Sequence, residues 1–149
     1  MTSDKWDKRF FDLAATIAGW SKESGKRVGA VIIGPDKEIR STGFNGFPRG
    51  VNDEIPERHS RETGAKYLWS VHAEVNAICN ATLIGVSLKD CTLYTTHFPC
   101  VGCAKAIIQC GIKNVISPLP DYNDVRWADE WRISEQMITE AGVVHKLIK

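Results

Sequence analysis

Two short segments of the chain carry residues that together could hold a catalytic metal ion. The first is His72-Ala73-Glu74, and the second is Pro99-Cys100-Val101-Gly102-Cys103. One imidazole and two thiolates supply three ligands to a tetrahedral zinc ion and leave its fourth position open, as a catalytic zinc requires. Glu74 is two residues from the histidine, where a carboxylate can move protons on water at that open position. These residues predict a zinc site that activates water.

The same residues have competing interpretations. A Cys-x-x-Cys pair alone also occurs in redox motifs, and a single histidine at the start of a helix is more often structural. A structural zinc ion with His97 or His59 as its fourth ligand is the main alternative, because His97 is close in sequence to Cys100. A structural site, however, would give no role to Glu74.

The periodicity of apolar residues places both halves of this set at the starts of helices. It predicts one helix over residues 71–83 and another from Pro99 to residue 110. Residues i and i+3 of a helix share a face, so both thiols can reach one ion. The partial positive charge of a helix N-terminus also favours thiolate over thiol.

The rest of the chain predicts strands that alternate with helices. A helix is expected from Trp6 to Ile17 with Asp4 as its cap, and a loop from residue 45 to about 58. We expect a three-layer α/β/α fold with a mixed central sheet of about five strands, the first two antiparallel and the later ones parallel. No repeat or linker divides the chain, so residues 1–149 are expected to form a single domain. The other predicted elements are strands at 27–33, 39–44, 92–96, 114–117 and 143–148 and a helix at 125–141.

Composition narrows the classes of function. The 149 residues are 43% hydrophobic and 25% charged, as in ordinary soluble domains. A formal net charge of +1 does not support a broad nucleic-acid interface, although a small anionic ligand needs only a few basic residues. No apolar run approaches the roughly 20 residues that span a bilayer, and the N-terminus lacks a secretory core. We therefore expect a cytoplasmic protein that contacts neither nucleic acid nor membrane.

The cysteines and tryptophans carry further expectations. The spacing of the five cysteines does not suggest a disulfide framework, and thiolate ligands need a reducing compartment. Cys79, Cys91 and Cys110 are expected to be buried small apolar residues. The five tryptophans are expected to pack the core and a subunit interface rather than stack on bases.

These motifs resemble those of the deoxycytidylate (dCMP) deaminases, within the cytidine-deaminase-like superfamily. Residues 72–78, His-Ala-Glu-Val-Asn-Ala-Ile, look like the helix motif of that subfamily. Residues 43–50, Gly-Phe-Asn-Gly-Phe-Pro-Arg-Gly, resemble its loop after the second strand, and residues 27–32 are similar to its first strand. The resemblance extends from about residue 4 to residue 149.

The resemblance implies a reaction and roles for the zinc-site residues. The reaction would be the hydrolysis of dCMP to dUMP and ammonia, which supplies dUMP for thymidylate synthesis. One zinc ion per chain would be bound by His72, Cys100 and Cys103. Glu74 would take a proton from the attacking water, protonate N3 of the pyrimidine and pass a proton to the leaving amine.

The substrate contacts are expected from both resemblance and position. In the family pattern, Asn45 contacts the substrate deep in the pocket. The backbone of Ala73 and the carbonyl of Thr95 or Pro99 are candidates to read the edge of the base. Three further residues stand near strand ends, where α/β folds place ligands, and are candidates for the 5′-phosphate. They are Arg27, Tyr122 and Arg126.

Regulation is expected from the resemblance alone. Many members of the family are hexamers that dCTP activates and dTTP inhibits, so we expect a homo-oligomer, most simply a hexamer. In such enzymes effector contacts lie near the loop at residues 43–50 and the basic segment before the first strand. Lys26, Phe47 and Arg49 are the corresponding candidates here.

Two other functions stay open at this point. The first is deamination of another substrate, such as cytidine, guanine or a tRNA adenosine, with the near-neutral net charge counting against tRNA. The second is a zinc-stabilised binding module without catalysis.

Overall fold

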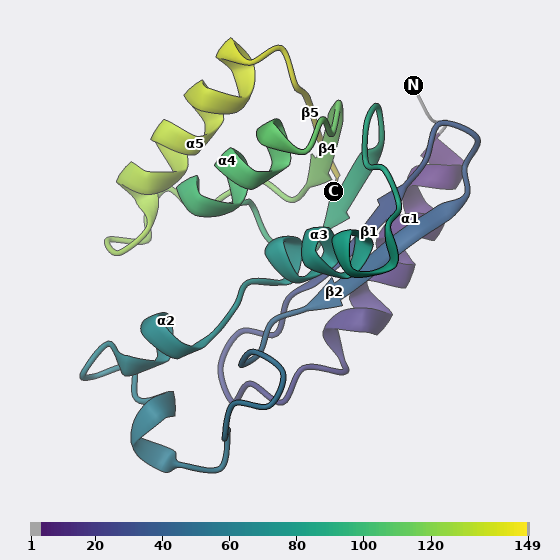
Figure 1. Ribbon diagram of the computed structural model, residues 1–149. Coiled ribbons are helices and arrows are strands. Elements are labelled where there is room, and N and C mark those ends of the chain that lie inside the picture. The colour runs from purple at the N-terminus through teal and green to yellow at the C-terminus, as the bar shows by residue number, and fades with distance from the viewer. Residues whose placement is uncertain (1–3, 149) are drawn as a thin grey trace.

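Five strands form one mixed sheet in the computed structural model, which describes residues 4–148 (Figure 1). β1 (Gly29–Ile33) lies between β2 (Ile39–Phe44) and β3 (Thr92–Thr95) and is antiparallel to both. β4 (Asn114–Ser117) and β5 (Val144–Leu147) continue the sheet in parallel to β3. The prediction of a mixed sheet with a leading hairpin and later parallel strands is confirmed.

Helices cover both faces of this sheet. α1 (Asp4–Ala18) lies on one face, and α3 (Ala73–Ile84), α4 (Val101–Gln109) and α5 (Ala128–Glu140) lie on the other (Figure 1). The predicted three-layer α/β/α arrangement is therefore confirmed. No helix within residues 4–148 is long and apolar enough to cross a bilayer.

Alternation along β1 explains how one strand serves two layers. Val31 and Ile33 join the apolar cluster under α1, whereas Ala30 and Ile32 join the cluster under α3 and α4. All five residues of β1 are buried. A strand covered on both faces is apolar throughout, which is why the sequence shows a continuous hydrophobic run here.

Two glycines let helices rest directly on the strands. A Cβ atom at Gly29 would lie 2.0 Å from the carbonyl oxygen of Ala14 in α1. A Cβ atom at Gly43 would lie 2.5 Å from the carbonyl oxygen of Ala73, at the start of α3. The second contact fixes the beginning of α3, and with it the motif at residues 72–74, close against β2.

A segment of residues 46–70, here called the lobe, extends beyond one end of the sheet (Figure 1). It contains the short 3-10 helix η1 (Pro56–His59) and the helix α2 (Ala65–Trp69). A bridge between Gly46 and Val71 closes its base. The prediction of a loop from residue 45 to about 58 missed η1, and α2 lies in a stretch for which no element was predicted. Neither short helix has an apolar stripe that periodicity could reveal.

Several predicted boundaries and burials need correction. His72 and Cys100 adopt extended backbone conformations as N-caps, with ψ of 152° and 173°, so neither lies in the first helical turn. The last helix begins at residue 128 rather than 125, and the first strand at residue 29 rather than 27. Asp4 is the first described residue of α1 rather than a residue that precedes it. Among the non-motif cysteines only Cys91 is buried. Cys79 is exposed because the sheet covers α3 on one side only, and Cys110 is partly buried.

Candidate active site

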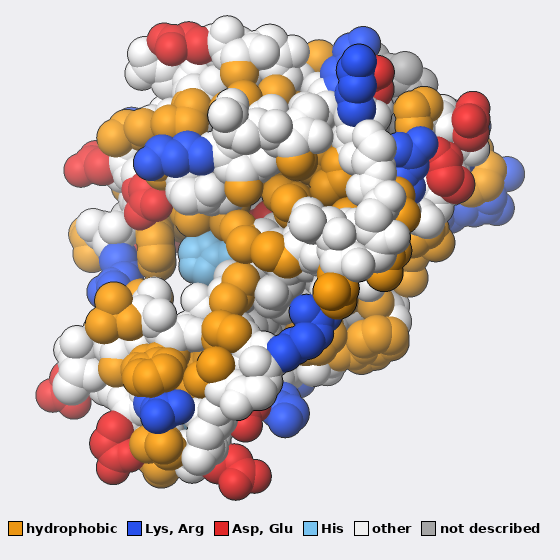
Figure 2. Space-filling view, viewed as in Figure 1, with side chains coloured by type: hydrophobic (Ala, Val, Ile, Leu, Met, Phe, Trp, Pro, Cys, Tyr) orange, Lys and Arg blue, Asp and Glu red, His pale blue; other side chains and the backbone are white. Residues whose placement is uncertain are grey.

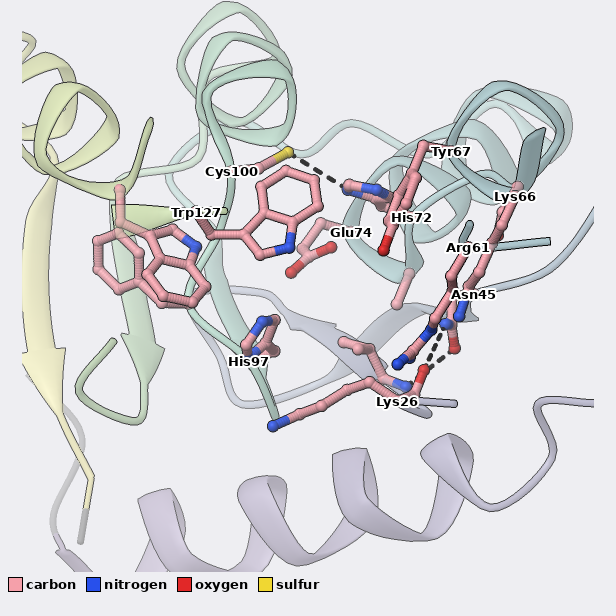
Figure 3. Close-up of a pocket in the computed structure, with 15 residues that line it drawn as sticks. Lys26, Asn45, Arg61, Lys66, Tyr67, His72, Glu74, His97, Cys100 and Trp127 are labelled. Carbon is pink, nitrogen blue, oxygen red and sulfur yellow. Dashed lines mark hydrogen bonds between the residues drawn. The ribbon is translucent and has the colours of Figure 1, made fainter. Parts of the chain in front are cut away.

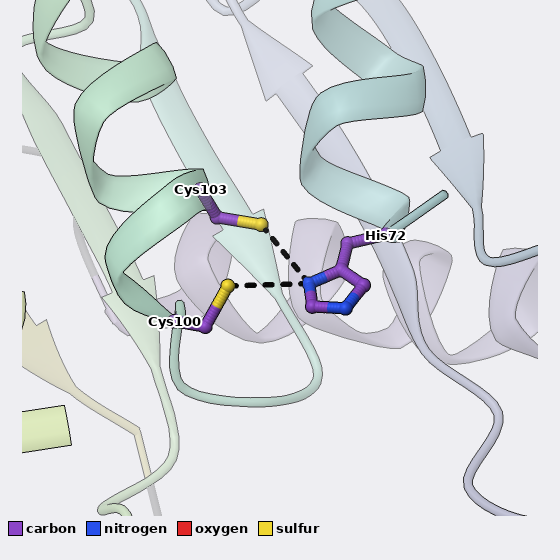
Figure 4. Close-up of side chains that lie close together, drawn as sticks. All are labelled: His72, Cys100 and Cys103. Atoms are coloured by element: carbon purple, nitrogen blue, oxygen red, sulfur yellow. Dashed lines mark hydrogen bonds between the residues drawn. The ribbon is translucent and has the colours of Figure 1, made fainter. Parts of the chain in front are cut away.

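The three proposed zinc ligands converge where α3 and α4 begin. His72 Nδ1 lies 3.3 Å from Cys100 Sγ and 3.4 Å from Cys103 Sγ (Figure 4). Donors that bind a tetrahedral zinc ion at about 2.0–2.3 Å are about 3.5 Å apart, so this spacing fits the ion. The donor set of two sulfurs and one imidazole nitrogen also suits zinc chemically.

No fourth protein ligand joins this cluster within residues 4–148. His97, the rival ligand closest in sequence, packs edge-on against Trp131 with ring centroids 5.4 Å apart. His59, the other rival, stacks on Phe47 in the lobe. The fold therefore does not form a structural zinc site with His97 or His59 as the fourth ligand.

The electrostatics of the cluster favour a bound cation. The hydrogen bond from the Cys103 thiol and the neighbouring His72 lower the pKa of Cys100 to about 4. The Cys100 sulfur in turn raises the pKa of His72 to about 9. A thiolate is thus present at neutral pH before metal arrives, and the binding of zinc displaces the proton from the histidine.

Glu74 is buried beside the ligands. Its carboxylate Oε1 accepts a hydrogen bond of 2.9 Å from the hydroxyl of Thr95, and its Oε2 lies 3.4 Å from Cys103 Sγ. Burial raises the pKa of Glu74 above its usual value. A carboxyl group whose pKa moves toward neutrality can both accept and return a proton, which is what a proton shuttle needs.

A pocket opens beside the cluster, between the lobe and the body of the molecule. Figure 2 shows the hollow, with a pale blue histidine side chain at its inner end. Among the residues predicted to bind substrate, Asn45 and Ala73 line the pocket, together with His72, Glu74 and Cys100 (Figure 3). These residues lie just after β2 and at the starts of α3 and α4, so the topology brings three separate motifs to one cavity.

Asn45 also has a structural role. Its Oδ1 accepts the backbone N–H of Val28, and its Nδ2 donates to the carbonyl oxygen of Lys26, both at 2.9 Å. The amide therefore fixes the chain just before β1. It retains one N–H and one lone pair for a ligand.

Two predicted substrate contacts lie behind the pocket wall rather than on it. The Thr95 hydroxyl is bonded to Glu74. The carbonyl oxygen of Pro99 accepts a 2.8 Å hydrogen bond from the hydroxyl of Ser134. Both residues are buried and are absent from the pocket lining.

The predicted phosphate contacts do not line the pocket. Arg27 is exposed and donates to the carbonyl oxygen of Glu23. Tyr122 bonds to Glu135, and the guanidinium of Arg126 covers the ring of Tyr67 at 3.7 Å. Nearness to a strand end places a residue at one end of the sheet. It does not predict the direction in which the side chain leaves the backbone.

The basic residues that do line the pocket are Lys26, Arg61 and Lys66, the last two from the lobe (Figure 3). Lys66 is buried and forms an ion pair of 3.4 Å with the buried Glu23. Arg61 lies against Gly25, where a Cβ atom would be 1.9 Å from its Nη2. The lack of a side chain at Gly25 thus makes room for the guanidinium. Sequence reasoning missed Arg61 and Lys66 because the lobe carries no periodic signal.

Aromatic side chains form another wall of the pocket. Tyr67, Phe98, Trp127 and Trp131 line it, and Trp131 and Phe98 are buried. Burial lowers the pKa of the neighbouring His97 to about 4, so that imidazole is neutral at pH 7. Trp131 is buried in the core, as expected, and also lines the pocket, whereas Trp127 is only partly buried and lines the pocket as well.

The three effector candidates have different surroundings. Lys26 lines the pocket itself. The ring of Phe47 stacks on His59 with centroids 4.6 Å apart. Arg49 bonds to Asn80 on the outer side of α3. Neither Phe47 nor Arg49 lines the pocket that contains Lys26.

This combination of fold and site defines a class of protein. A Cys-Cys-His zinc set with a buried carboxyl group beside its open side, at the helix starts of an α/β/α sandwich, is the site of a zinc-dependent deaminase. Residues 4–118 match the family model "Cytidine and deoxycytidylate deaminase zinc-binding region". The chain belongs to this family, and α5 lies beyond the matched region.

Known relatives agree with this assignment. Human deoxycytidylate deaminase is 37% identical over 145 residues, which cover 95% of this chain and 79% of that protein. An Aliivibrio fischeri protein named as an uncharacterized deaminase is 42% identical over 140 residues, 93% of this chain and 90% of that one. The crystal structure of dCMP deaminase from cyanophage S-TIM5 with dCMP and dUMP has a TM-score of 0.80. That alignment covers 99% of this chain and 100% of the phage chain at 22% identity, which supports the fold.

Proposed function

We propose that this protein hydrolyses dCMP to dUMP and ammonia and so supplies dUMP for thymidylate synthesis. One observation carries the proposal: buried Glu74 adjoins the zinc-ligand cluster in a pocket that also holds three basic side chains. The human relative that is 37% identical is itself named for this activity, which supports the choice of substrate.

The chain's own residues account for the proton transfers. Zinc in this site supplies the Lewis acidity that makes water nucleophilic near neutral pH. Glu74 accepts one proton of the attacking water and delivers it to N3 of the pyrimidine. It then accepts the second proton from the hydroxyl group added at C4 and delivers it to the departing amine, so that C4 becomes a carbonyl and ammonia leaves. The Thr95 hydroxyl holds Oε1 of Glu74 in place, and Oε2 lies beside the ligand Cys103, on the side of the zinc site. Such positioned acid–base catalysis contributes about 10²–10⁴-fold to a rate.

The aromatic wall suits a flat pyrimidine ring. The partly buried Trp127 and the buried Phe98 both line the pocket with Glu74, and Figure 3 draws the Trp127 ring near the carboxylate. Aromatic faces stack on a base and exclude water from it. Both effects strengthen the hydrogen bonds by which Glu74 and the Ala73 backbone read the base edge.

The basic side chains of the pocket suit a 5′-phosphate. Arg61 and Lys26 are exposed at the pocket wall, whereas the charge of Lys66 is already balanced by Glu23. A guanidinium can bind a phosphate through two parallel hydrogen bonds. We therefore assign the phosphate to Arg61 and Lys26, which line the pocket, in preference to Arg27, Tyr122 and Arg126, which do not.

Arg61→Ala is expected to lower kcat/KM for dCMP at least about tenfold, because each charge-assisted hydrogen bond is worth about 1.5–3 kcal/mol. Its kcat/KM for deoxycytidine should change by less than about twofold, since deoxycytidine lacks the phosphate. Steady-state assays of dCMP, deoxycytidine, cytidine and guanine test both statements and the choice of substrate. Arg9→Ala, an exposed arginine on α1 across the sheet, is the matched control. Equal kcat/KM values for dCMP and deoxycytidine in the unaltered protein would refute a phosphate site.

We also propose the regulation and assembly that the family suggests. The enzyme would be a hexamer that dCTP activates and dTTP inhibits. Arg49 bonds to Asn80, and Asn80 donates a 2.8 Å hydrogen bond to the Thr42 carbonyl, so a ligand on Arg49 would act on both α3 and β2. α3 begins next to His72 and carries Glu74, which gives such a ligand a route to the active site.

Arg49→Ala is expected to weaken the dCTP response while kcat at saturating dCMP stays nearly unchanged. Coupling between two sites is typically 1–3 kcal/mol, about 5–150-fold in affinity, so the loss is measurable in dCMP saturation curves with and without dCTP. Light scattering gives the mass of the assembly. A monomer with hyperbolic kinetics, indifferent to both triphosphates, would contradict regulation and assembly without touching the zinc chemistry.

The remaining expectations concern organisation and location. We infer that the chain acts as one deaminase domain, which is supported by the packing of its described helices on a single sheet. Its thiolate ligands need reducing conditions, which supports a cytoplasmic location.

A further inference from the structure

We propose that α5 holds the zinc-binding turn in position, with Glu130 and Ser134 as its two positioning residues. Neither side chain belongs to the three-residue cluster of candidate ligands. Each instead bonds to the backbone on one side of Cys100.

Glu130 acts on the C-terminal side of that cysteine. Its Oε1 accepts the backbone N–H of Val101 at 3.2 Å. Val101 is the first residue of α4, and the first N–H groups of a helix have no partner within the helix itself. A carboxylate at this helix N-terminus also interacts favourably with the helix dipole, typically by about 0.3–1 kcal/mol.

Ser134 acts on the N-terminal side. Its side chain is fully buried, and its hydroxyl donates a 2.8 Å hydrogen bond to the carbonyl oxygen of Pro99. Pro99 is itself among the fully buried side chains. The residues on either side of Cys100 are therefore each tied to α5 by a hydrogen bond.

The spacing of Glu130 and Ser134 lets both of them contact the same turn. Positions 130 and 134 are one helical turn apart, so they share a face of α5. Trp131 follows Glu130 on the same helix, lines the pocket and packs edge-on against His97. Helix α5 thus aligns the turn that carries Cys100 and the aromatic wall of the pocket.

Loss of the bonds between α5 and this turn should weaken zinc binding. Cys100 is an N-cap residue with extended backbone. Its carbonyl oxygen accepts a helical hydrogen bond of 2.8 Å from the Ala104 N–H, but its own N–H lies outside the helix, so the bonds to the neighbouring Pro99 and Val101 help to hold it. Groups that orient metal ligands from outside the coordination sphere typically change metal affinity by about 10–100-fold when they are removed. The same range is expected here for the loss of either bond to α5.

The test measures zinc binding rather than turnover, because the proposal rests on the zinc site and not on the identity of the substrate. Glu130→Ala and Ser134→Ala are each expected to raise the zinc dissociation constant about 10–100-fold, as measured by competition with a chromogenic chelator. The absorption bands of the cobalt-substituted protein should change in shape, because they report the geometry around the thiolates. Glu130→Gln keeps an acceptor for the Val101 N–H and should recover most of the affinity.

Matched controls lie on the same helix. Asp129→Ala removes a fully exposed carboxylate next to Glu130, and Thr139→Ala removes an exposed hydroxyl that bonds within α5. Both should bind zinc as the unaltered protein does. If Glu130→Ala does not fold, Ser134→Ala and Glu130→Gln carry the test.

Zinc affinity and cobalt spectra that match the controls, together with a lower melting temperature, would overturn the proposal and leave α5 a merely structural element. A protein that binds zinc in this α5-dependent way but does not act on dCMP would instead contradict only the proposed substrate.

Discussion

Glu74→Gln is expected to lower kcat for dCMP by about 10²–10⁴-fold while the protein keeps its fold and its zinc. The amide has nearly the same size as the carboxyl group, and its oxygen can still accept the hydrogen bond from Thr95. It cannot accept and return a proton near neutral pH, so only the proton transfers are lost. Steady-state rates, zinc content and a thermal melt measure the three quantities separately.

The control for this change is Glu57→Gln, an exposed glutamate in η1. It should leave the rate within about twofold of the unaltered enzyme, as surface substitutions usually have small effects. Retention of even a tenth of the activity by Glu74→Gln would mean that another group moves the protons. His97 would then be the first alternative, because it is neutral and lines the same pocket.

Cys103→Ala is expected to abolish zinc binding and, with it, activity. Two protein ligands would remain, and zinc is held poorly by two. Zinc content after dialysis should fall from near one ion per chain to near zero. The protein should still fold, because the substitution removes only one sulfur atom. That atom is buried and contacts Glu74 Oε2, so a modest loss of stability is expected.

Two other cysteines serve as controls for this loss. Cys91→Ala removes an equally buried thiol that lies outside the cluster, and Cys79→Ala removes an exposed one. Both should keep their zinc. Full zinc content in Cys103→Ala would show that Cys103 is not one of the ligands that hold the ion.

The two chemical motifs could be predicted because their information is local. His72 and Glu74 are two residues apart, and Cys100 and Cys103 are three apart, so each pair is oriented by a single helix start whatever the rest of the fold does. The prediction of an α/β fold was enough to expect that the starts of α3 and α4 lie close together. The burial that raises the pKa of Glu74 could not be predicted, because it depends on Thr95 and on the packing around it.

The residues that line the pocket around the zinc site could not be predicted as well. Arg27, Tyr122 and Arg126 were predicted as phosphate contacts because they stand near strand ends, yet none of them lines the pocket, whereas Arg61 and Lys66 do. The lobe that carries these two residues lacks periodic apolar positions, and the Glu23–Lys66 ion pair is one of the contacts that join it to the rest of the chain. A contact between residues 43 positions apart in the chain leaves no local pattern.

The sequence by itself determined the layered fold, the metal-binding residue types and the family. These follow from periodicity and from spacings of two to four residues, which act within one helix or strand. Only the tertiary structure decided which basic and aromatic side chains line the pocket, and that Glu130 and Ser134 reach the turn at Cys100. The physical reason is that such contacts depend on how whole elements pack, and packing is set by many distant residues at once.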